Sequence, residues 1–388
     1  MTYARRLLSN QTHAVSRRTA ERRFFLVPTG FCKRVVAYAF AVANEEFPQV
    51  QLHVLVAMSN HLETVVSDLH GPDEVSQLPG FFAAVHGLIA KAMNQELKRG
   101  ESFWCPGSYR NTEIHDLPAL ADRLVYALAN PAAADLVESL SDWPGLHYGP
   151  EEWTRSEGIT VDRPEGAFFG GRQDLVVPTD PDELRAYRER RRERRAEALQ
   201  AARQSDRDQG LTKEQAREAA GRRRKERKRD RARKRSRSTL PDQATLRIVA
   251  PPSYRGREAE AAAMILSQLE VREREHRQRR RREKKGVLGP ERVLAVSPTD
   301  SPGDTKPKFD LAPVVACKDK RKRKQILKCL DGWRRRYREA REAWPDERQE
   351  FPPGTFQMVA EHGADLMSEA RALREELILE PTGPPARA

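Results

Sequence analysis

Residues 50–67 read VQLHVLVAMSNHLETVVS, and this stretch decides the fold. Apolar and polar side chains partly alternate over residues 50–56, a run rich in Val and Thr follows over residues 61–67, and the intervening Ser59-Asn60 is typical of a turn. We therefore predict two strands joined by a tight turn. Because side chains two positions apart on a strand point to the same face, His61 and Glu63 share a face, and Leu62 points to the opposite, core side.

The segments around this hairpin predict an α+β domain. Short apolar or β-branched runs at residues 13–15 and 24–27 suit strands. Residues 35–42 fit a buried helix that ends near Phe47-Pro48, and residues 78–97 have the spacing of an amphipathic helix. A helix over residues 117–130 is expected to end at Pro131, which lacks the N–H of a helix-interior residue. The order strand, strand, helix, strand, strand, helix, helix predicts an antiparallel sheet with helices on it.

The positive charge of the chain is concentrated in one stretch. The 388 residues carry 70 Lys and Arg against 57 Asp and Glu, a formal net charge of +13, and 33% of the chain is charged. Residues 181–240 alone hold 23 of the Lys and Arg and 11 of the Asp and Glu. This balance favours a polyanionic partner, nucleic acid first and an anionic membrane surface second. The densest basic run supplies the candidate nucleic-acid contacts Arg222, Arg223, Arg224, Lys225, Arg227, Lys228 and Arg229.

Several classes of protein are excluded by what the sequence lacks. The longest strictly apolar run, residues 35–43, is far shorter than the ~20 residues of a membrane span, and no signal-peptide segment is found. Neither a Walker-type phosphate loop nor a Gly-x-Ser-x-Gly elbow is present. The cysteines form no close pair that would predict a disulfide framework or a zinc finger: Cys32, Cys105, Cys317 and Cys329. We expect a cytoplasmic, nucleoid-associated protein with no membrane segment.

Composition divides the chain into four parts. Residues 12–150 have the composition of a folded domain, and residues 151–285 form a basic arm that is either helical or disordered. Residues 286–313 are a linker rich in Pro, Ser and Gly, and residues 314–388 form an amphipathic helical segment. In that last segment, apolar side chains recur at spacings of 3 and 4 and form one helix face: Ile326, Leu330, Trp333, Tyr337, Ala340 and Trp344. This face is expected either to dock on the globular part or to pair with a partner.

Two pairs of residues are candidates for chemistry. An imidazole and a carboxylate on one strand face, as for His61 and Glu63, are suitable ligands for a divalent ion such as Mg²⁺ or Mn²⁺. Tyr126 and Asn130 are one helical turn apart, so both lie on the same helix face. Each pair also has a purely structural interpretation. The first is a solvated sheet face, and the second is a core tyrosine with an asparagine that closes the helix.

Aromatic residues in the loop after the second predicted helix have two interpretations. Phe103, Trp104 and Tyr109 could stack on unpaired bases, as in proteins that bind single strands. Alternatively they fill the core, which is the interpretation we favour for Phe103 and Trp104 because large aromatic side chains dominate cores.

Four ordered segments together resemble a known family. They read VSRRTAERRFFL, VAMSNHLETVV, IAKAMN…ESFWCPGSY and LVYALANPAAADLV…WPGL, and they cover roughly residues 12–146. The combination resembles the REP-associated, single-tyrosine transposases of the HUH class. It is most similar to their longer members, and the segment WRRRYREAREAW…FPPGTFQM near the C-terminus of this chain resembles the tail of those members.

The resemblance implies a fold, an activity and a set of site residues. It implies an HUH-type, ferredoxin-like sandwich over residues 12–150 that binds single-stranded or hairpin DNA. The enzyme would cleave and rejoin single-stranded DNA through a 5′-phosphotyrosine, with Tyr126 as the nucleophile. His61 falls on the first His of the His-hydrophobic-His motif that holds Mg²⁺ or Mn²⁺, Leu62 on the hydrophobic position, and Asn130 on the polar residue that completes the metal site.

One position departs from the family pattern, because Glu63 stands where the second motif His belongs. A carboxylate is a good ligand for Mg²⁺ or Mn²⁺, but it lowers the Lewis acidity of the ion and repels an incoming phosphate. Two functions therefore stay open. The first is an active transposase, and the second is a degenerate or domesticated member that binds hairpin DNA or RNA without cleavage. The basic arm would supply phosphate contacts in either case, or would act as an unrelated RNA or membrane-surface tether. A monomer and a homodimer are equally compatible with the sequence.

Overall fold

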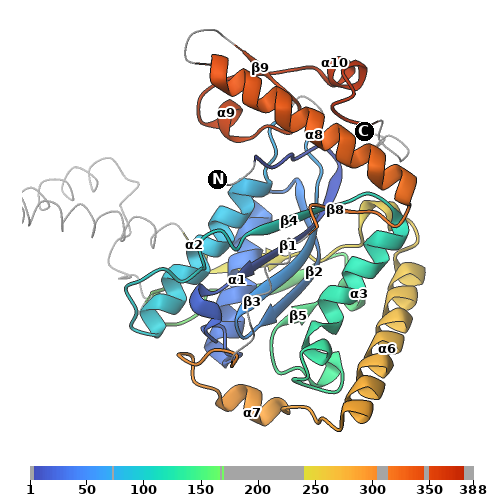
Figure 1. Cartoon of the computed structure of the whole chain (residues 1–388). Helices are drawn as coiled ribbons and strands as arrows, with labels where there is room; N and C mark the ends of the chain where they lie inside the picture. Colours follow the sequence, from blue (N-terminus) through green and yellow to red (C-terminus); the bar gives the residue numbers. More distant parts are fainter. Residues whose placement is uncertain are drawn as a thin grey trace, which may run out of the picture. The chain divides into compact units, whose positions relative to one another are not determined.

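The computed structural model describes residues 4–71, 74–166, 168–169, 240–303, 313–344 and 349–379. The chain divides into two compact units, one of Met1–Pro164 with Asp242–Ala388 and one of Glu165–Pro241. The first unit contains the strands and helices described below (Figure 1).

A six-stranded sheet forms the centre of the first unit. Its strand order is β5-β2-β3-β1-β4-β8, and all neighbouring strands are antiparallel except β4 and β8. The strands are β1 (Gln11–Arg18), β2 (Val50–Met58), β3 (His61–Asp68), β4 (Arg110–Ile114), β5 (His147–Tyr148) and β8 (Val315–Ala316). The predicted hairpin of residues 50–67 is confirmed as β2 and β3, two of the central strands.

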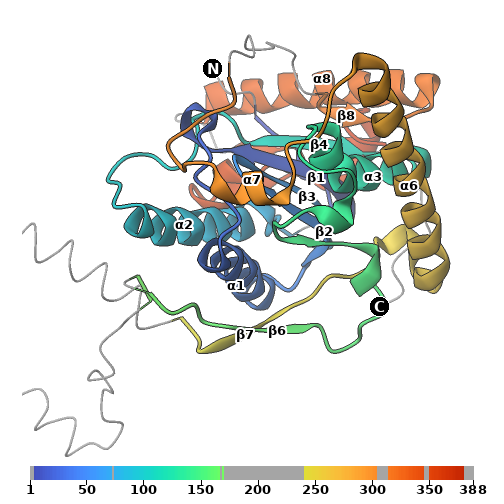
Figure 2. The same cartoon turned by 90° about the horizontal axis from the view of Figure 1, so that it is seen from below.

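Helices cover both faces of this sheet (Figure 2). On one face lie α1 (Gly30–Glu46) and α2 (Leu78–Glu96), with the hairpin of β6 (Ile159–Asp162) and β7 (Gln243–Leu246) beside α1. On the other face lies α3 (Leu117–Ala133), which packs against the long helix α6 (Glu258–Glu283). A short helix, α7 (Pro290–Ala295), lies within the stretch whose composition predicts a linker. The predicted α+β class, with helices on a sheet, is confirmed.

The structure corrects three details of the prediction. Residues 24–27 form turns and coil instead of a strand, and their apolar side chains are buried, as for Phe25 at 1% exposure. Strand β4 was not predicted, because its sequence RNTEI is mostly polar. The sheet is mixed and not purely antiparallel, because β8 arrives from a distant part of the chain and pairs parallel to β4.

The end of α3 also differs from the prediction, since the helix continues through Pro131 to Ala133. The buried Arg280 of α6, which is 2% exposed, reaches this end of the helix. Its guanidinium donates hydrogen bonds to Ala132 O at 2.9 Å and to Glu138 Oε2 at 2.6 Å. These contacts satisfy a helix-terminal carbonyl and fasten α6 to α3.

The C-terminal part is built on α8 (Lys320–Ala343), which lies across the top of the unit in Figure 1. It is followed by β9 (Glu350–Phe351), α9 (Gln357–Ala360), β10 (Asp365–Leu366) and α10 (Glu369–Arg374). The predicted apolar face of α8 is buried against β8 and against a cluster that contains Phe351, Met358 and Ala364. The sequence left open whether this face docks on the same chain or pairs with a partner. In the structure it docks on the same chain.

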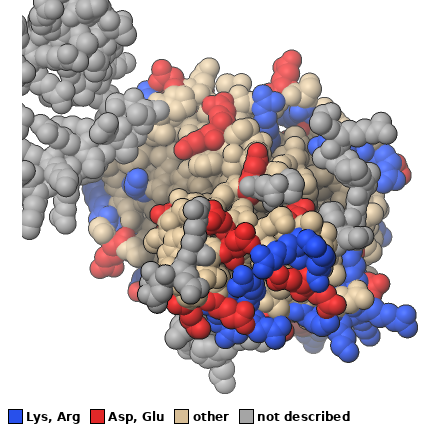
Figure 3. Space-filling model, turned by 90° about the horizontal axis from the view of Figure 1, so that it is seen from above, with Lys and Arg blue, Asp and Glu red and all other residues tan. Residues whose placement is uncertain are grey.

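The surface seen from the α8 side carries both signs of charge (Figure 3). Lys and Arg side chains lie there among Asp and Glu side chains, and they do not form a surface of a single sign. Within the described ranges, no helix is both long enough and apolar enough to cross a lipid bilayer.

Candidate functional site

The register of the sheet places His61 and Glu63 on the face that α3 covers. His61 is paired with Arg18 on β1 and Met58 on β2, and Glu63 is paired with Ser16. Directly opposite residues in a sheet point to the same face, so these side chains form one continuous surface. The side chains of His61 and Glu63 are only 19% and 16% exposed, and Leu62 is buried on the other face.

The imidazole of His61 is oriented by hydrogen bonds on both nitrogens. Its Nδ1–H donates to Oδ1 of Asn60 at 2.7 Å, which leaves the lone pair on Nε2. Nε2 accepts from Nδ2 of Asn130 at 3.3 Å and lies 3.7 Å from Oε1 of Glu63. Burial, reinforced by Arg18 and Arg22, lowers the pKa of His61 to about 4, so the ring is neutral at pH 7.

Glu63 occupies a sheltered position among cationic side chains. Burial raises the pKa of its carboxyl to about 8, although Arg18, Arg123 and Arg110 act in the opposite direction. A carboxylate in such a place is stabilised by a cation held beside it.

Helix α3 brings Tyr126 and Asn130 to the same place. The helix starts at an N-cap, where Oδ1 of Asp116 accepts from the N–H of Ala119 at 2.7 Å. Most apolar side chains in the middle of α3 are buried, but Tyr126 is 48% exposed. Partial burial and the nearby Glu63 raise the pKa of the Tyr126 hydroxyl. The tyrosine is therefore reachable from solvent and lies within electrostatic range of Glu63.

Three arginines surround this tyrosine, and the sequence argument did not identify them. Arg18 and Arg110 extend from β1 and β4 on the same sheet face as Glu63, through the register Glu63, Ser16, Arg110. The guanidinium of Arg123, one turn before Tyr126 on α3, lies 5.8 Å from the tyrosine ring centre. None of the three has a carboxylate ion-pair partner among the described residues. The only sequence signal for them is the three-residue spacing of Arg123 and Tyr126, because Arg18 and Arg110 are brought in by strand pairing.

Within this arginine cluster (Arg18, Arg110 and Arg123), the positive charge of a neighbouring arginine affects the pKa of Arg18. Burial lowers the pKa of Arg18, and Arg110 and Arg22 lower it further. Half-buried cations with no ion pair among the described residues, and with Glu63 as a nearby carboxyl, are suited to receive a further anion. A phosphodiester is one anion of this kind.

The side chains at this site fit a divalent ion. His61 offers Nε2, Glu63 offers carboxylate oxygens, and the amide of Asn130 carries an oxygen; Mg²⁺ and Mn²⁺ accept such mixed donors. Within the described parts of the chain, no group of three or more His, Cys, Asp and Glu side chains could hold a metal ion. The set at His61 therefore depends on Asn130 as a third ligand, and water or phosphate oxygens would have to complete the coordination.

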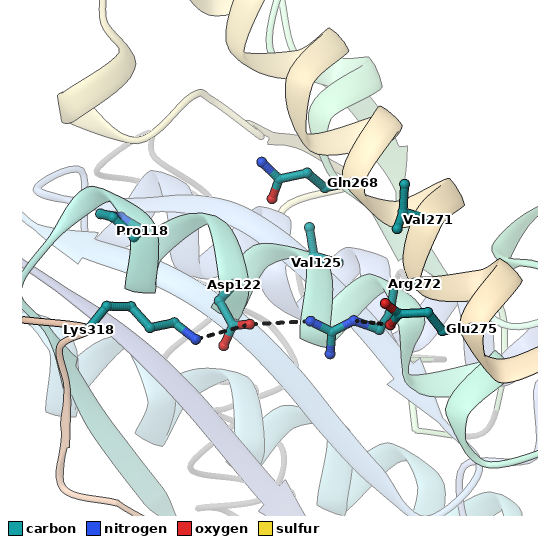
Figure 4. A pocket seen from close by; sticks show the side chains of 8 residues that line it. All are labelled: Pro118, Asp122, Val125, Gln268, Val271, Arg272, Glu275 and Lys318. Atoms are coloured by element: carbon teal, nitrogen blue, oxygen red, sulfur yellow. Dashed lines mark hydrogen bonds and ion pairs between the residues drawn. The ribbon is translucent and has the colours of Figure 1, made fainter. Parts of the chain in front are cut away.

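A surface pocket between α3 and α6 is separate from this cluster (Figure 4). Asp122 lies between two cations there, 3.3 Å from Arg272 and 3.5 Å from Lys318. Because its charges neutralise one another, we assign no ligand to this pocket.

The remaining predicted residues lie elsewhere. Phe103 and Trp104 are buried in the core at 2% and 5% exposure, as favoured from the sequence. Tyr109 packs against Phe82 and His86, and the guanidinium of Arg5 lies 4.7 Å from its ring centre, so it is not free for base stacking. The candidate nucleic-acid contacts at positions 222–225 and 227–229 lie outside the described residues.

Comparisons with known proteins give partial likenesses only. No family model matches the sequence, and no curated protein matches it. One similar solved structure is a REP-associated tyrosine transposase bound to a REP hairpin, with 16% identity, a TM-score of 0.32, and coverage of 37% of this chain and 81% of its own. Another is a candidate transposase from Deinococcus radiodurans R1, with 17% identity, a TM-score of 0.22, and coverage of 29% of this chain and 84% of its own. At these values the two structures do not establish the family of this chain.

Proposed function

We propose that this chain is a transposase that cleaves and rejoins single-stranded DNA, with Tyr126 as its nucleophile. The observation that carries the proposal is the exposure of Tyr126, at 48%, beside the Glu63 carboxyl and the guanidinium of Arg123. A tyrosine that served only packing would be buried like its neighbours on α3. The segments that resemble HUH-class transposases include the same tyrosine and the same histidine.

In the proposed reaction, the Tyr126 oxygen attacks the phosphorus of a phosphodiester. The bond between tyrosine oxygen and phosphorus forms, the bond to the 3′ oxygen breaks, and the products are a 5′-phosphotyrosine and a 3′-hydroxyl. Arg18, Arg110 and Arg123 would hold the phosphate and stabilise the negative charge that develops on its oxygens. The tyrosine proton passes to water, which reaches the hydroxyl because Tyr126 is 48% exposed, and the leaving 3′ oxygen takes a proton from water.

His61, Glu63 and Asn130 would hold the divalent ion. The chemistry that such an ion supplies when bound is the polarisation of a phosphate oxygen. Asn60 would orient His61 for metal binding without touching the ion. Its hydrogen bond with Nδ1 of His61 fixes the tautomer in which Nε2 has the lone pair that coordinates.

The experiment that tests this proposal is a covalent-adduct assay. The full chain is incubated with a labelled single-stranded hairpin oligonucleotide and Mn²⁺, and the adduct is separated under denaturing conditions. We expect an adduct that chelator abolishes and that Tyr126→Phe abolishes. A matched control is Tyr148→Phe on β5, which should leave the yield unchanged. Adduct formation by Tyr126→Phe would contradict the assignment of the nucleophile.

Glu63 favours a second candidate function, which is binding of hairpin DNA or RNA without cleavage. A carboxyl with a pKa near 8 is largely protonated at neutral pH, and it stands where the resemblance calls for an imidazole. The discriminating variant is Glu63→His in the same adduct assay. If the native chain forms no adduct and Glu63→His does, the chain is a binding protein with a decayed site. Equal adduct yields in both would rule this second function out.

A further inference from the structure

Helix α8 is rich in Lys and Arg, and it is held in place by the rest of the first unit. Its 24 residues include 11 Lys and Arg against three Asp and Glu. The helix begins at Asp319, whose Oδ1 accepts from the N–H groups of Arg321 and Lys322 at 2.7 and 3.0 Å. Nζ of Lys322 also donates to the carbonyl of His115 at 2.8 Å, which joins the start of α8 to the end of β4.

The apolar face of α8 is buried within the protein. Trp333 is 0% exposed and donates from Nε1 to the carbonyl of Pro353 at 2.7 Å, and Tyr337 is 8% exposed and stacks on Trp333. The helix therefore cannot turn without opening a core, and its outward face is held in one orientation.

Basic side chains form a line on that outward face. At 100° per residue, the side chains of Lys320, Lys324, Lys328, Arg335 and Arg338 fall within about a quarter turn of one another. The line is about 27 Å long at 1.5 Å per residue. Asp331 lies within it, and Glu339 and Glu342 lie at its C-terminal end, so the three carboxylates of α8 share this face with a larger number of cations. Lys328 is paired with Glu376 at 2.7 Å. The other four are exposed and have no ion-pair partner among the described residues.

We propose that this outward face of α8, the α8 surface, binds the sugar-phosphate backbone of duplex DNA. The helix holds 11 Lys and Arg against three Asp and Glu, so cations outnumber anions on it. Cations held along a rigid helix can contact the regular phosphates of a duplex, which carries one charge per ~1.7 Å of axis. This inference goes beyond the proposed function, because it involves neither Tyr126 nor the residues around it.

Two other polyanions fit the α8 surface less well. Proteins that bind single strands stack bases on exposed aromatic rings, and both aromatic residues within α8 face inward. An amphipathic helix binds a membrane through its apolar face, and that face of α8 is already buried. Leu327 is the only large apolar side chain of α8 that is substantially exposed.

The test compares two matched triple variants of the full chain, both in a Tyr126→Phe background so that no cleavage occurs. One carries Lys320→Gln, Lys324→Gln and Arg335→Gln on the α8 surface. The other carries Arg34→Gln, Lys91→Gln and Arg155→Gln, which are exposed basic residues on other elements. Both keep residues 181–240, so the contribution of that stretch cancels. Binding to a blunt 20-base-pair duplex is measured by fluorescence anisotropy from 50 to 300 mM salt, beside one of its strands alone and vesicles containing phosphatidylserine.

We expect the α8 variant to lose about tenfold or more in duplex affinity, and the slope of log affinity against log salt to fall by about 2.7. The control variant should lose far less. A gain-of-affinity variant guards against misfolding: Asp331→Asn removes the interrupting anion and should raise duplex affinity about twofold. Equal losses in the two triple variants, an equal loss for the single strand, or a loss confined to vesicles would each overturn the proposal. Absence of an adduct in the active-site assay would leave it intact, because that result concerns Tyr126 alone.

Discussion

Nδ2 of Asn130 lies 3.3 Å from Nε2 of His61, although 69 residues separate them in the chain. The contact joins the last turns of α3 to the start of β3, and it fixes the distance between the helix that carries Tyr126 and the strand that carries Glu63. Nε2 is the nitrogen that would coordinate a metal ion, so Asn130 controls its surroundings directly.

Asn130→Ala should therefore weaken metal binding without unfolding the protein. Loss of a ligand or of a group that orients one typically lowers metal affinity by about 10–100-fold. The measurement is a Mn²⁺ titration followed by adduct yield at saturating and subsaturating metal. Asn94→Ala on α2 is the control, because Asn94 donates to the backbone of Glu101 and is remote from the sheet face of His61. Unchanged Mn²⁺ affinity in Asn130→Ala would remove this residue from the site.

Arg110→Gln should lower the affinity for DNA without lowering the stability of the protein. The arginine cluster repels itself, so removing one cation is expected to leave the free energy of unfolding unchanged or to raise it by a few tenths of a kcal/mol. At the same time, DNA affinity should fall, and the salt slope should decrease by about 0.9 for the lost phosphate contact. Anisotropy with a single-stranded oligonucleotide, together with urea unfolding, measures both effects. A drop in stability that accompanies full DNA affinity would mean that Arg110 is structural.

Arg280→Met should destabilise the protein, because it removes a buried cation from two carboxylates. Arg280 is 2% exposed and contacts Glu138 at 2.6 Å and Asp135 at 3.4 Å. Asp135 and Glu138 are 29% and 49% exposed, so water solvates them after the change, and the expected loss is that of hydrogen bonds to charged groups, about 1.5–3 kcal/mol. The neighbouring Arg281→Met is the matched control, since Arg281 is exposed and should change the free energy of unfolding by less than about 0.5 kcal/mol. Similar urea midpoints for the two variants would contradict the structural role of Arg280.

The parts of the fold that could be predicted are those governed by local patterns. The β2–β3 hairpin follows from its turn and its apolar runs, and the buried face of α8 follows from spacing alone. Residues 24–27 have the composition of a strand but form a loop. Phe25 is buried there against Phe103, and the guanidinium of Arg99 lies 3.9 Å from its ring centre. Burial of apolar side chains did not require strand pairing at this point.

The candidate site was only partly predictable for a related reason. His61, Glu63, Tyr126 and Asn130 each lie in a recognisable segment, but their proximity depends on how α3 packs on the sheet. Arg110 could not be identified, because β4 is too polar to predict as a strand and its register with β1 is a long-range property. Pro131 misled the prediction of the helix end, since α3 runs on for only two residues beyond it, and its last turn is fastened by the hydrogen bond from Arg280 of a distant helix to the Ala132 carbonyl.

Acid should destabilise the protein already below pH 6.5, because several of its histidines are buried in the neutral form. Burial lowers the pKa of His13 and of His53 to about 4, while an unfolded histidine titrates near ~6.5. Between these values the unfolded chain binds protons that the folded chain excludes, so stability falls as the pH decreases from 6.5 to 4. Above pH 6.5 these two groups contribute no pH dependence.

His13→Leu should reduce this sensitivity to acid. Both ring nitrogens of His13 are buried without a hydrogen-bond partner, so an apolar replacement of similar size is expected to change the free energy of unfolding at pH 7 by less than about 1 kcal/mol. Urea unfolding at pH 7, 6, 5 and 4.5 should give a smaller decrease for this variant than for the native chain. His362→Leu, which replaces an exposed histidine, is the control and should keep the native decrease. If His13→Leu also keeps the full decrease, His13 does not exclude protons in the folded state, and the acid sensitivity must be assigned to the other buried histidines.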